Sequence, residues 1–262
     1  MEVGGRRSLL HILPCVGETI DVNTADGVAD SYLARPGDGR AHPGVLFLID
    51  AFGLRPQIER MADRVAAMGY VVLAPNVFYR AGRAPVVSLD GLGDPERRGE
   101  VFGRVMPLMR ALTPERIVAD GAAYLDRLEE EAGGGPVAIT GYCMGGRLGW
   151  RIAAACPDRV AALGCFHTGG LVGDGDDSPH LGAAAIDAEL YLGFADHDKS
   201  ATPAQIATVE GALRAAGKEF RAEVYAGAAH GYTMADTPAY DEAAAERHFE
   251  ELTALLARTV AA

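Results

Sequence analysis

The sequence predicts an α/β fold: a mostly parallel, doubly wound sheet with helices on both faces and a leading antiparallel hairpin. Short, continuously apolar segments, typical of strands covered on both faces, alternate with segments of helical periodicity. The 262 residues are 49% hydrophobic and 23% charged, which suits one globular domain with one large core. We therefore expect residues 17–262 to form a single domain after a flexible N-terminal segment, 1–16.

The leading hairpin is predicted from residues 18–36, which turn at Ala25-Asp26-Gly27. Glycine at the end of such a turn allows a tight reversal between two strands. The core strands are then predicted from the apolar segments at residues 45–49, 70–74, 137–140, 161–166, 189–194 and 220–225.

Helices are predicted between these strands from residues that favour helix N-termini, from apolar residues spaced along one helical face, and from glycines that follow helix C-termini. Pro56 opens a stripe of apolar side chains that ends before Gly69. Thr113 precedes another helix, Thr202 and Gln205 form a capping box for a third, and residues 240–258 form a closing amphipathic helix. Residues 79–112, rich in glycine, proline and arginine, form either a cover over the strand ends or an ordinary surface excursion.

The net charge and the length of the apolar runs argue against two classes of partner, nucleic acids and membranes. A net charge of -12 supplies no basic stripe for a nucleic acid, and no apolar run approaches the roughly 20 residues that span a bilayer. Two arginines near the start resemble an export signal, but His11 and Pro14 interrupt the apolar run that follows. Four cysteines without CxxC spacing indicate reduced thiols, and hence a cytoplasmic protein.

One cysteine stands in a pattern that predicts chemistry. Gly141-Tyr142-Cys143-Met144-Gly145 follows a predicted strand and precedes a helix, the context of a nucleophile on a sharp turn. Such a turn is strained and crowds the residues two before and two after the nucleophile, where glycine fits. The helix N-terminus favours a thiolate and a developing oxyanion, with the Met144 amide as one donor.

A base and an orienting acid are expected at later strand ends. His230 follows the strand at 220–225, and Asp196 follows the strand at 189–194, which gives the order nucleophile, acid, histidine. Asp198 competes with Asp196, which we favour because it is nearer the strand end. His167 follows another strand and is a candidate for the pocket wall.

With GYCMGG, ADHD and AAHGYT in this order, the chain resembles the dienelactone hydrolase family of α/β-hydrolases. The resemblance implies the α/β-hydrolase fold and a Cys143, His230, Asp196 triad. It also implies an oxyanion hole formed by the backbone amides of Met144 and Ala51.

The resemblance also implies substrate contacts, and here the sequence departs from the family. The resemblance implies that Asp50 is a fourth carboxylate that modulates the nucleophile; the family has a glutamate there, associated with control of the cysteine's protonation, and aspartate is one methylene shorter. Arg80 stands where the family has an arginine that can meet a substrate carboxylate. Met234 replaces a second arginine, which favours a neutral or more apolar ester. We expect Arg80, Met234 and three other residues to line the pocket: Tyr142, His167 and Tyr232.

The predicted function is hydrolysis of a small ester or lactone through a thioester acyl-enzyme, with no cofactor. We expect no metal, because the acidic residues 174–178 lack the glycine and glutamate of a calcium loop. The expected partner is a small molecule, and the expected state a monomer or homodimer. Two alternatives are a non-catalytic ligand binder or sensor on the same fold, and a thiol redox protein.

Overall fold

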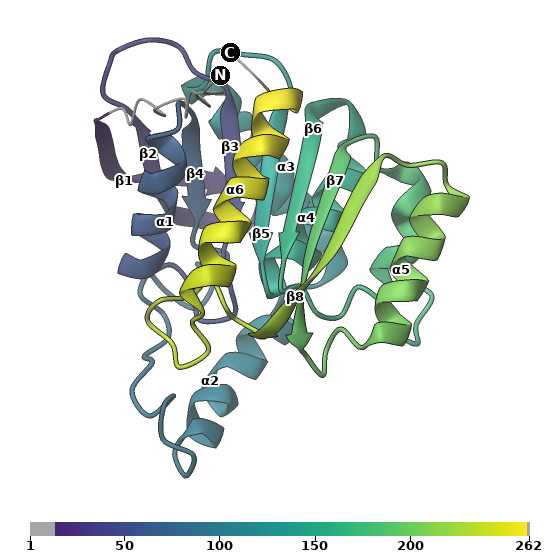
Figure 1. Cartoon of the computed structure of the whole chain (residues 1–262). Coiled ribbons are helices and arrows are strands. Elements are labelled where there is room, and N and C mark those ends of the chain that lie inside the picture. Colours follow the sequence, from purple (N-terminus) through teal and green to yellow (C-terminus); the bar gives the residue numbers. More distant parts are fainter. Residues whose placement is uncertain (1–13, 261–262) are drawn as a thin grey trace, which may run out of the picture.

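The computed structural model of the chain describes residues 14–260, arranged around one eight-stranded sheet (Figure 1). The strand order is β1-β2-β4-β3-β5-β6-β7-β8. The strands are β1 (Cys15–Thr24), β2 (Gly27–Pro36), β3 (Gly44–Leu48), β4 (Val71–Pro75), β5 (Val137–Tyr142), β6 (Val160–Phe166), β7 (Glu189–His197) and β8 (Phe220–Ala229).

The predicted hairpin and parallel core are both present. β1 pairs antiparallel with β2, and the turn between them lies at residues 25–26. β2 also pairs antiparallel with β4, whereas the six strands from β4 to β8 pair in parallel. The predicted fold class is therefore confirmed. Most of the segment expected to be flexible lies outside the described residues, while Cys15 and Val16 already belong to β1.

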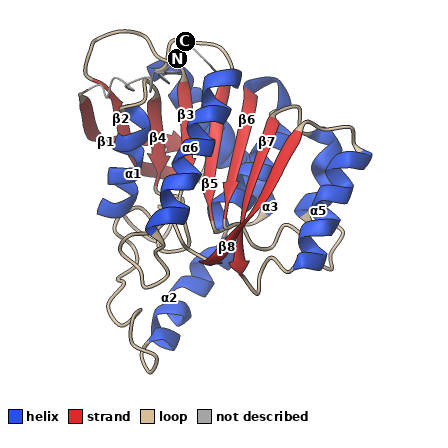
Figure 2. Ribbon diagram, viewed as in Figure 1, coloured by secondary structure: helices blue, strands red, loops and turns tan. Residues whose placement is uncertain are grey.

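The helices cover both faces of the sheet: α1 and α6 lie on one face, and α3 and α4 on the other (Figures 1 and 2). The Thr113 cap and the Thr202–Gln205 capping box form as predicted. The helices are α1 (Pro56–Ala66), α2 (Arg98–Ala111), α3 (Pro114–Glu131), α4 (Met144–Ala155), α5 (Pro203–Ala215) and α6 (Glu242–Thr259), with short 3-10 turns η1 (Pro157–Arg159) and η2 (Pro179–Ala185).

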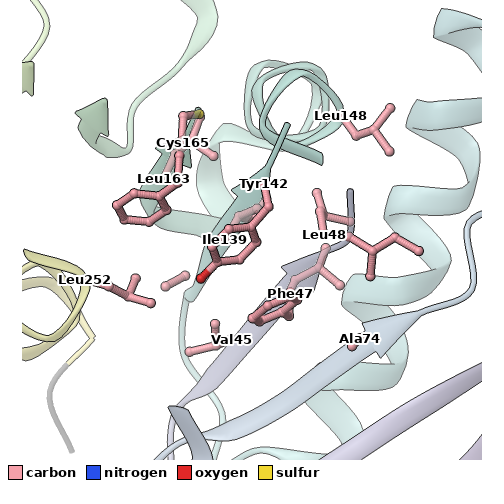
Figure 3. Close-up of a cluster of buried hydrophobic side chains, with 14 of the residues drawn as sticks. Val45, Phe47, Leu48, Ala74, Ile139, Tyr142, Leu148, Leu163, Cys165 and Leu252 are labelled. Carbon is pink, nitrogen blue, oxygen red and sulfur yellow. The ribbon is translucent and has the colours of Figure 1, made fainter. Parts of the chain in front are cut away.

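The core lies between the sheet and its helices (Figure 3). Phe47 of β3 and Tyr142 of β5 stack with ring centroids 4.7 Å apart, and both are fully buried. Leu148 of α4 and Leu252 of α6 belong to the same hydrophobic core and come from helices on opposite faces of the sheet. Central strands whose side chains are buried on both faces explain why their sequences are continuously apolar.

Residues 79–112 contain α2, which lies beyond the lower end of the sheet in Figure 2. Only Val101 and Val105 of this helix are buried, while Phe102 and Met106 are exposed. The segment contributes Leu92, Arg98 and Phe102 to a cavity that also contains Cys143. Of the two readings left open by the sequence, the cover over the strand ends is the one that the structure supports.

Candidate active site

Cys143 lies on a strained turn between β5 and α4. Its backbone has φ 55° and ψ -115°, and a positive φ is rare for any residue other than glycine. A Cβ on Gly141 would lie 2.4 Å from the Gly145 carbonyl oxygen, and a Cβ on Gly145 would lie 2.1 Å from the Leu48 carbonyl oxygen. Both distances are too short for any side chain, so the two glycines of the predicted pattern are required by backbone contact.

The thiol, an imidazole and a carboxylate converge beside this turn. His230 Nε2 lies 3.0 Å from Cys143 Sγ, and His230 Nδ1 lies 2.6 Å from Asp198 Oδ2. The other Asp198 oxygen accepts hydrogen bonds from the backbone N–H and hydroxyl of Ser200, at 2.7 and 2.6 Å. Three strand ends, those of β5, β7 and β8, therefore supply a nucleophile, an acid and a base in hydrogen-bond contact.

The electrostatics favour a charged imidazole. Burial opposes protonation of His230, but the Cys143 sulfur and the Asp198 carboxylate outweigh it and raise the pKa of His230 from 6.5 to about 10. Burial likewise raises the pKa of the Asp198 carboxyl, but hydrogen bonds with His230 and Ser200 bring it below its ordinary value. A carboxylate beside an imidazolium is the arrangement that orients a catalytic histidine.

The prediction that Asp196 orients the histidine is wrong. The Asp196 side chain is exposed, and its Oδ2 accepts a hydrogen bond from the Gly227 N–H at 2.9 Å. β7 continues to His197, three residues beyond its apolar run, and its pairing with β8 shifts register between Ala195 and His197. The first carboxylate free to turn toward His230 is consequently Asp198, the alternative left open in the sequence.

The predicted oxyanion hole requires two backbone N–H groups that are not already hydrogen-bonded, and Met144 and Ala51 meet this condition within the described residues. Met144 is the first residue of α4, where the helix offers its N–H no acceptor. Ala51 lies in the turn after β3, and among the described residues its N–H has no acceptor either. The Leu48 carbonyl packs against Gly145 of the elbow, which holds the end of β3 close to the start of α4.

A cavity of about 330 Å³ opens beside Cys143 and His230. Its wall is largely apolar, and among the described residues that line it Arg98 is the only lysine or arginine. The lining residues are Asp50, Ala51, Phe52, Leu92, Arg98, Phe102, Cys143, His167, His230, Gly231, Met234, Thr237, Pro238 and Ala239. The size and character of this cavity suit a small, mostly apolar molecule.

His167 and Met234 line the cavity as expected. His167 Nε2 lies 2.7 Å from Thr233 Oγ1, and its ring meets the His230 ring edge-on with centroids 5.4 Å apart. Burial lowers the pKa of His167 well below 6.5, and His230 lowers it further. His167 is therefore an uncharged residue of the cavity wall that packs against the His230 ring.

Two other predicted pocket residues, Tyr142 and Tyr232, do not reach the cavity. Tyr142 is fully buried under the elbow, where its hydroxyl lies 2.9 Å from His248 Nε2 (Figure 3). Tyr232 is also fully buried and donates a hydrogen bond to the Gly193 carbonyl oxygen at 3.1 Å. The Tyr142 side chain, at the end of β5, and the Tyr232 side chain, in the turn after β8, both point into the core rather than into the cavity, so the predictions for them are wrong.

The prediction for Arg80 is wrong for a different reason. Its guanidinium donates two hydrogen bonds to the Asp120 carboxylate, at 2.7 and 2.9 Å, and a third to Asp26 at 2.8 Å. It does not line the cavity. An arginine already paired with two carboxylates is not available for a substrate carboxylate.

Asp50 lines the cavity but is occupied by Arg55, a residue that the sequence did not single out. The Arg55 guanidinium holds both Asp50 carboxylate oxygens, at 2.7 and 2.9 Å. Within the described chain the Cys143 sulfur has its hydrogen-bond contact with His230 and none with Asp50. The expected control of the cysteine by Asp50 is therefore not supported. An arginine among apolar residues right after a buried strand was the available signal.

Over residues 14–260, no group of three or more His, Cys, Asp or Glu side chains is placed to hold a metal ion. Within the same residues, no helix has the length and apolar character needed to cross a bilayer.

Comparison with known proteins agrees with the geometry. The family model described as "Dienelactone hydrolase family" matches residues 29–260. A protein of Salmonella typhi named "Putative carboxymethylenebutenolidase" is 30% identical over 233 residues, which cover 85% of this chain and 80% of that protein. A protein of Methylorubrum extorquens with the same name is 30% identical over 227 residues, covering 84% and 74%.

A solved structure extends the likeness to the fold. The protein named "Putative Dienelactone Hydrolase" from Klebsiella pneumoniae superposes with a TM-score of 0.81 at 22% identity, covering 94% of this chain and 99% of that one.

Proposed function

The chain belongs to the dienelactone hydrolase family, and we propose that it hydrolyses a small, uncharged ester or lactone through Cys143, His230 and Asp198. The family membership makes it an ester or lactone hydrolase. The proposal adds the residues, the acyl-enzyme and the character of the substrate.

The observation that carries the proposal is the contact chain from sulfur to carboxylate. Cys143 Sγ, His230 and Asp198 are joined by contacts of 3.0 and 2.6 Å, and the sulfur sits on the strained elbow at the N-terminus of α4. The Cys143 sulfur and the Asp198 carboxylate raise the pKa of His230 to about 10, which favours the protonated imidazole. A thiolate paired with that imidazolium is a strong nucleophile.

Each step of the proposed reaction then has a residue to perform it. The Cys143 thiolate attacks the carbonyl carbon, and the resulting oxyanion accepts hydrogen bonds from the Met144 and Ala51 amides. His230 gives its proton to the leaving alkoxide as the carbon–oxygen bond breaks, which leaves a thioester on Cys143. His230 then takes a proton from water, the hydroxide attacks the thioester, and acid and thiolate are released.

The substrate is proposed from the cavity wall. Arg80 is held by Asp120 and Asp26 outside the cavity, and Met234 is an apolar part of the wall. Within residues 14–260, therefore, no arginine pair lines the cavity to hold a carboxylate, and the volume of about 330 Å³ suits a molecule at the small end of the drug-sized range.

The test is an ester and lactone panel combined with intact-protein mass spectrometry. We expect Cys143→Ala to abolish turnover of an activated aryl ester while the fold survives, and the native chain to show an acyl adduct on Cys143. Cys156→Ala is the matched control, because Cys156 is a half-buried free thiol outside the cavity. Unchanged turnover in Cys143→Ala, or an adduct on another residue, would contradict the proposal.

We also propose a reducing compartment, the cytoplasm, because all four cysteines are free thiols. Fractionation of cells that produce the protein tests this, and a protein found outside the cytoplasm would contradict it.

A further inference from the structure

Every hydrogen-bond donor of Arg55 is used, and the side chain is 5% exposed. Its Nη1 donates to Asp50 and to the Gly53 carbonyl oxygen, and its Nη2 donates to Asp50 and to Asp236. Its Nε donates to the second oxygen of Asp236 at 2.7 Å. All five N–H groups of the guanidinium therefore donate a hydrogen bond, and four of these bonds hold two carboxylates, each through two bonds. Lysine cannot replace this planar, two-sided arrangement.

On one side the guanidinium holds the turn that contains Ala51. The Asp50 carboxylate accepts the Phe52 N–H at 3.0 Å, and the Asp50 carbonyl oxygen accepts the Gly53 N–H at 3.3 Å. Ala51 therefore lies inside a turn that is stabilised by the Asp50 carboxylate, and this carboxylate is hydrogen-bonded to Arg55. Arg55 itself is fixed, because its carbonyl oxygen accepts the Ile58 N–H at the start of α1.

On the other side the guanidinium holds the segment that follows His230. Asp236 lies six residues after His230, between Met234 and Thr237, which both line the cavity. Arg55, which is 181 residues from Asp236 in the chain, thus joins two cavity walls, one carrying an oxyanion amide and the other following the base.

We propose that Arg55 is a positioning residue: by holding Asp50 and Asp236 at once, it fixes the Ala51 amide relative to His230 and the sulfur. This inference rests on the proposed Cys143 mechanism. An amide displaced by even 1 Å leaves the oxyanion, and loss of one such donor costs about a hundredfold or more in turnover. Arg55 touches no reacting atom, so its effect should appear in kcat rather than in KM.

The test compares Arg55→Lys, Arg55→Met and Asp236→Asn on an activated aryl ester. Lysine keeps the charge but cannot hold two carboxylates with planar forks. We expect kcat to fall at least tenfold in Arg55→Lys and about a hundredfold in Arg55→Met, with KM within about twofold. We expect a smaller fall in Asp236→Asn, in which one side of the bridge is weakened.

Two measurements separate positioning from loss of structure. Turnover is expressed per Cys143 that reacts with iodoacetamide, so that misfolded protein is not counted. The pH dependence of that alkylation should be unchanged in Arg55→Lys, since the sulfur, His230 and Asp198 are untouched. Arg64→Met is the matched control: Arg64 also joins α1 to a distant carboxylate, Glu246 of α6, but away from the cavity. It should keep kcat within twofold.

Unchanged kcat per reactive Cys143 in Arg55→Lys and Arg55→Met would overturn the inference. So would a rise in KM at constant kcat, or an equal loss in Arg64→Met. If Arg55→Met does not fold, Arg55→Lys and Asp236→Asn decide the question. Failure of the proposed mechanism has a different signature, namely turnover by Cys143→Ala.

Discussion

Replacement of Asp198 by asparagine tests the assignment of the orienting acid most directly. The carboxylate lies 2.6 Å from His230 Nδ1, a short, charge-assisted contact, and its side chain is 2% exposed. Asparagine keeps the shape but removes the charge. It also offers an N–H where the imidazole needs an acceptor, which favours the tautomer that cannot accept a proton from the thiol.

The expected loss follows from breaking a buried pair. In a triad of this kind, replacing the acid by asparagine leaves the histidine in the wrong tautomer and lowers turnover by up to about 10⁴-fold. We therefore expect kcat/KM of Asp198→Asn to fall by about a hundredfold to several thousandfold. Two hydrogen bonds from Ser200 to the Asp198 oxygen Oδ1 hold the side chain in place, so the loss should come from charge and tautomer rather than from movement.

The assay is steady-state hydrolysis of an activated aryl ester, with the thermal midpoint of each variant measured in parallel. Asp196→Asn is the control, because this carboxylate is exposed and, within residues 14–260, its side-chain hydrogen bond is with the Gly227 N–H and not with His230. It should keep kcat/KM within about threefold. The reasoning is refuted if Asp196→Asn loses activity while Asp198→Asn, still folded, keeps more than a tenth of it.

Three further predictions concern the elbow, the pH profile and selectivity. Gly145→Ala should lower the free energy of unfolding by about 1–3 kcal/mol and reduce turnover at least tenfold, because the new Cβ would lie 2.1 Å from the Leu48 carbonyl oxygen. Chemical denaturation measures the change in stability, and Gly211→Ala is the control, because a Cβ there would meet nothing within 4 Å. The rate of acylation, followed as the first burst of product, should stay level through neutrality and fall as pH rises through about 10, where His230 of the free enzyme loses the proton needed by the leaving group; a step near 6.5 in that burst would contradict the ion pair. Met234→Arg should raise kcat/KM for a carboxylate-bearing ester relative to a neutral one by about tenfold or more, and no change in that ratio would show that Met234 does not set selectivity.

The sequence was sufficient for the fold because its signals are local. Strands buried on both faces are continuously apolar, and the helix caps at Thr113 and Thr202 are made by neighbouring residues. The elbow was predictable for the same reason, since the glycines at 141 and 145 respond to contacts imposed by the turn itself. The position of His230 followed from the strand that precedes it.

The acid was missed because the end of β7 is decided by its partner strand. Pairing with β8 extends β7 past its apolar run to His197, and the register shift there alters which side chains face the base. The local sequence Ala195-Asp196-His197-Asp198 does not indicate this register shift. Arg80 was likewise misplaced because its partners, Asp26 and Asp120, are more than 35 residues away in the chain.

Chemistry and selectivity are carried by different parts of this molecule. Cys143, His230 and Asp198 stand at the ends of parallel strands, whose backbone pairing fixes them to one another. The cavity wall instead comes largely from segments outside the sheet, namely residues 79–112 and the turn after His230. Changes in those segments can alter the substrate while the strand ends keep their geometry. Arg55 is where the two parts meet, because it links the turn that bears an oxyanion amide to a wall of the cavity.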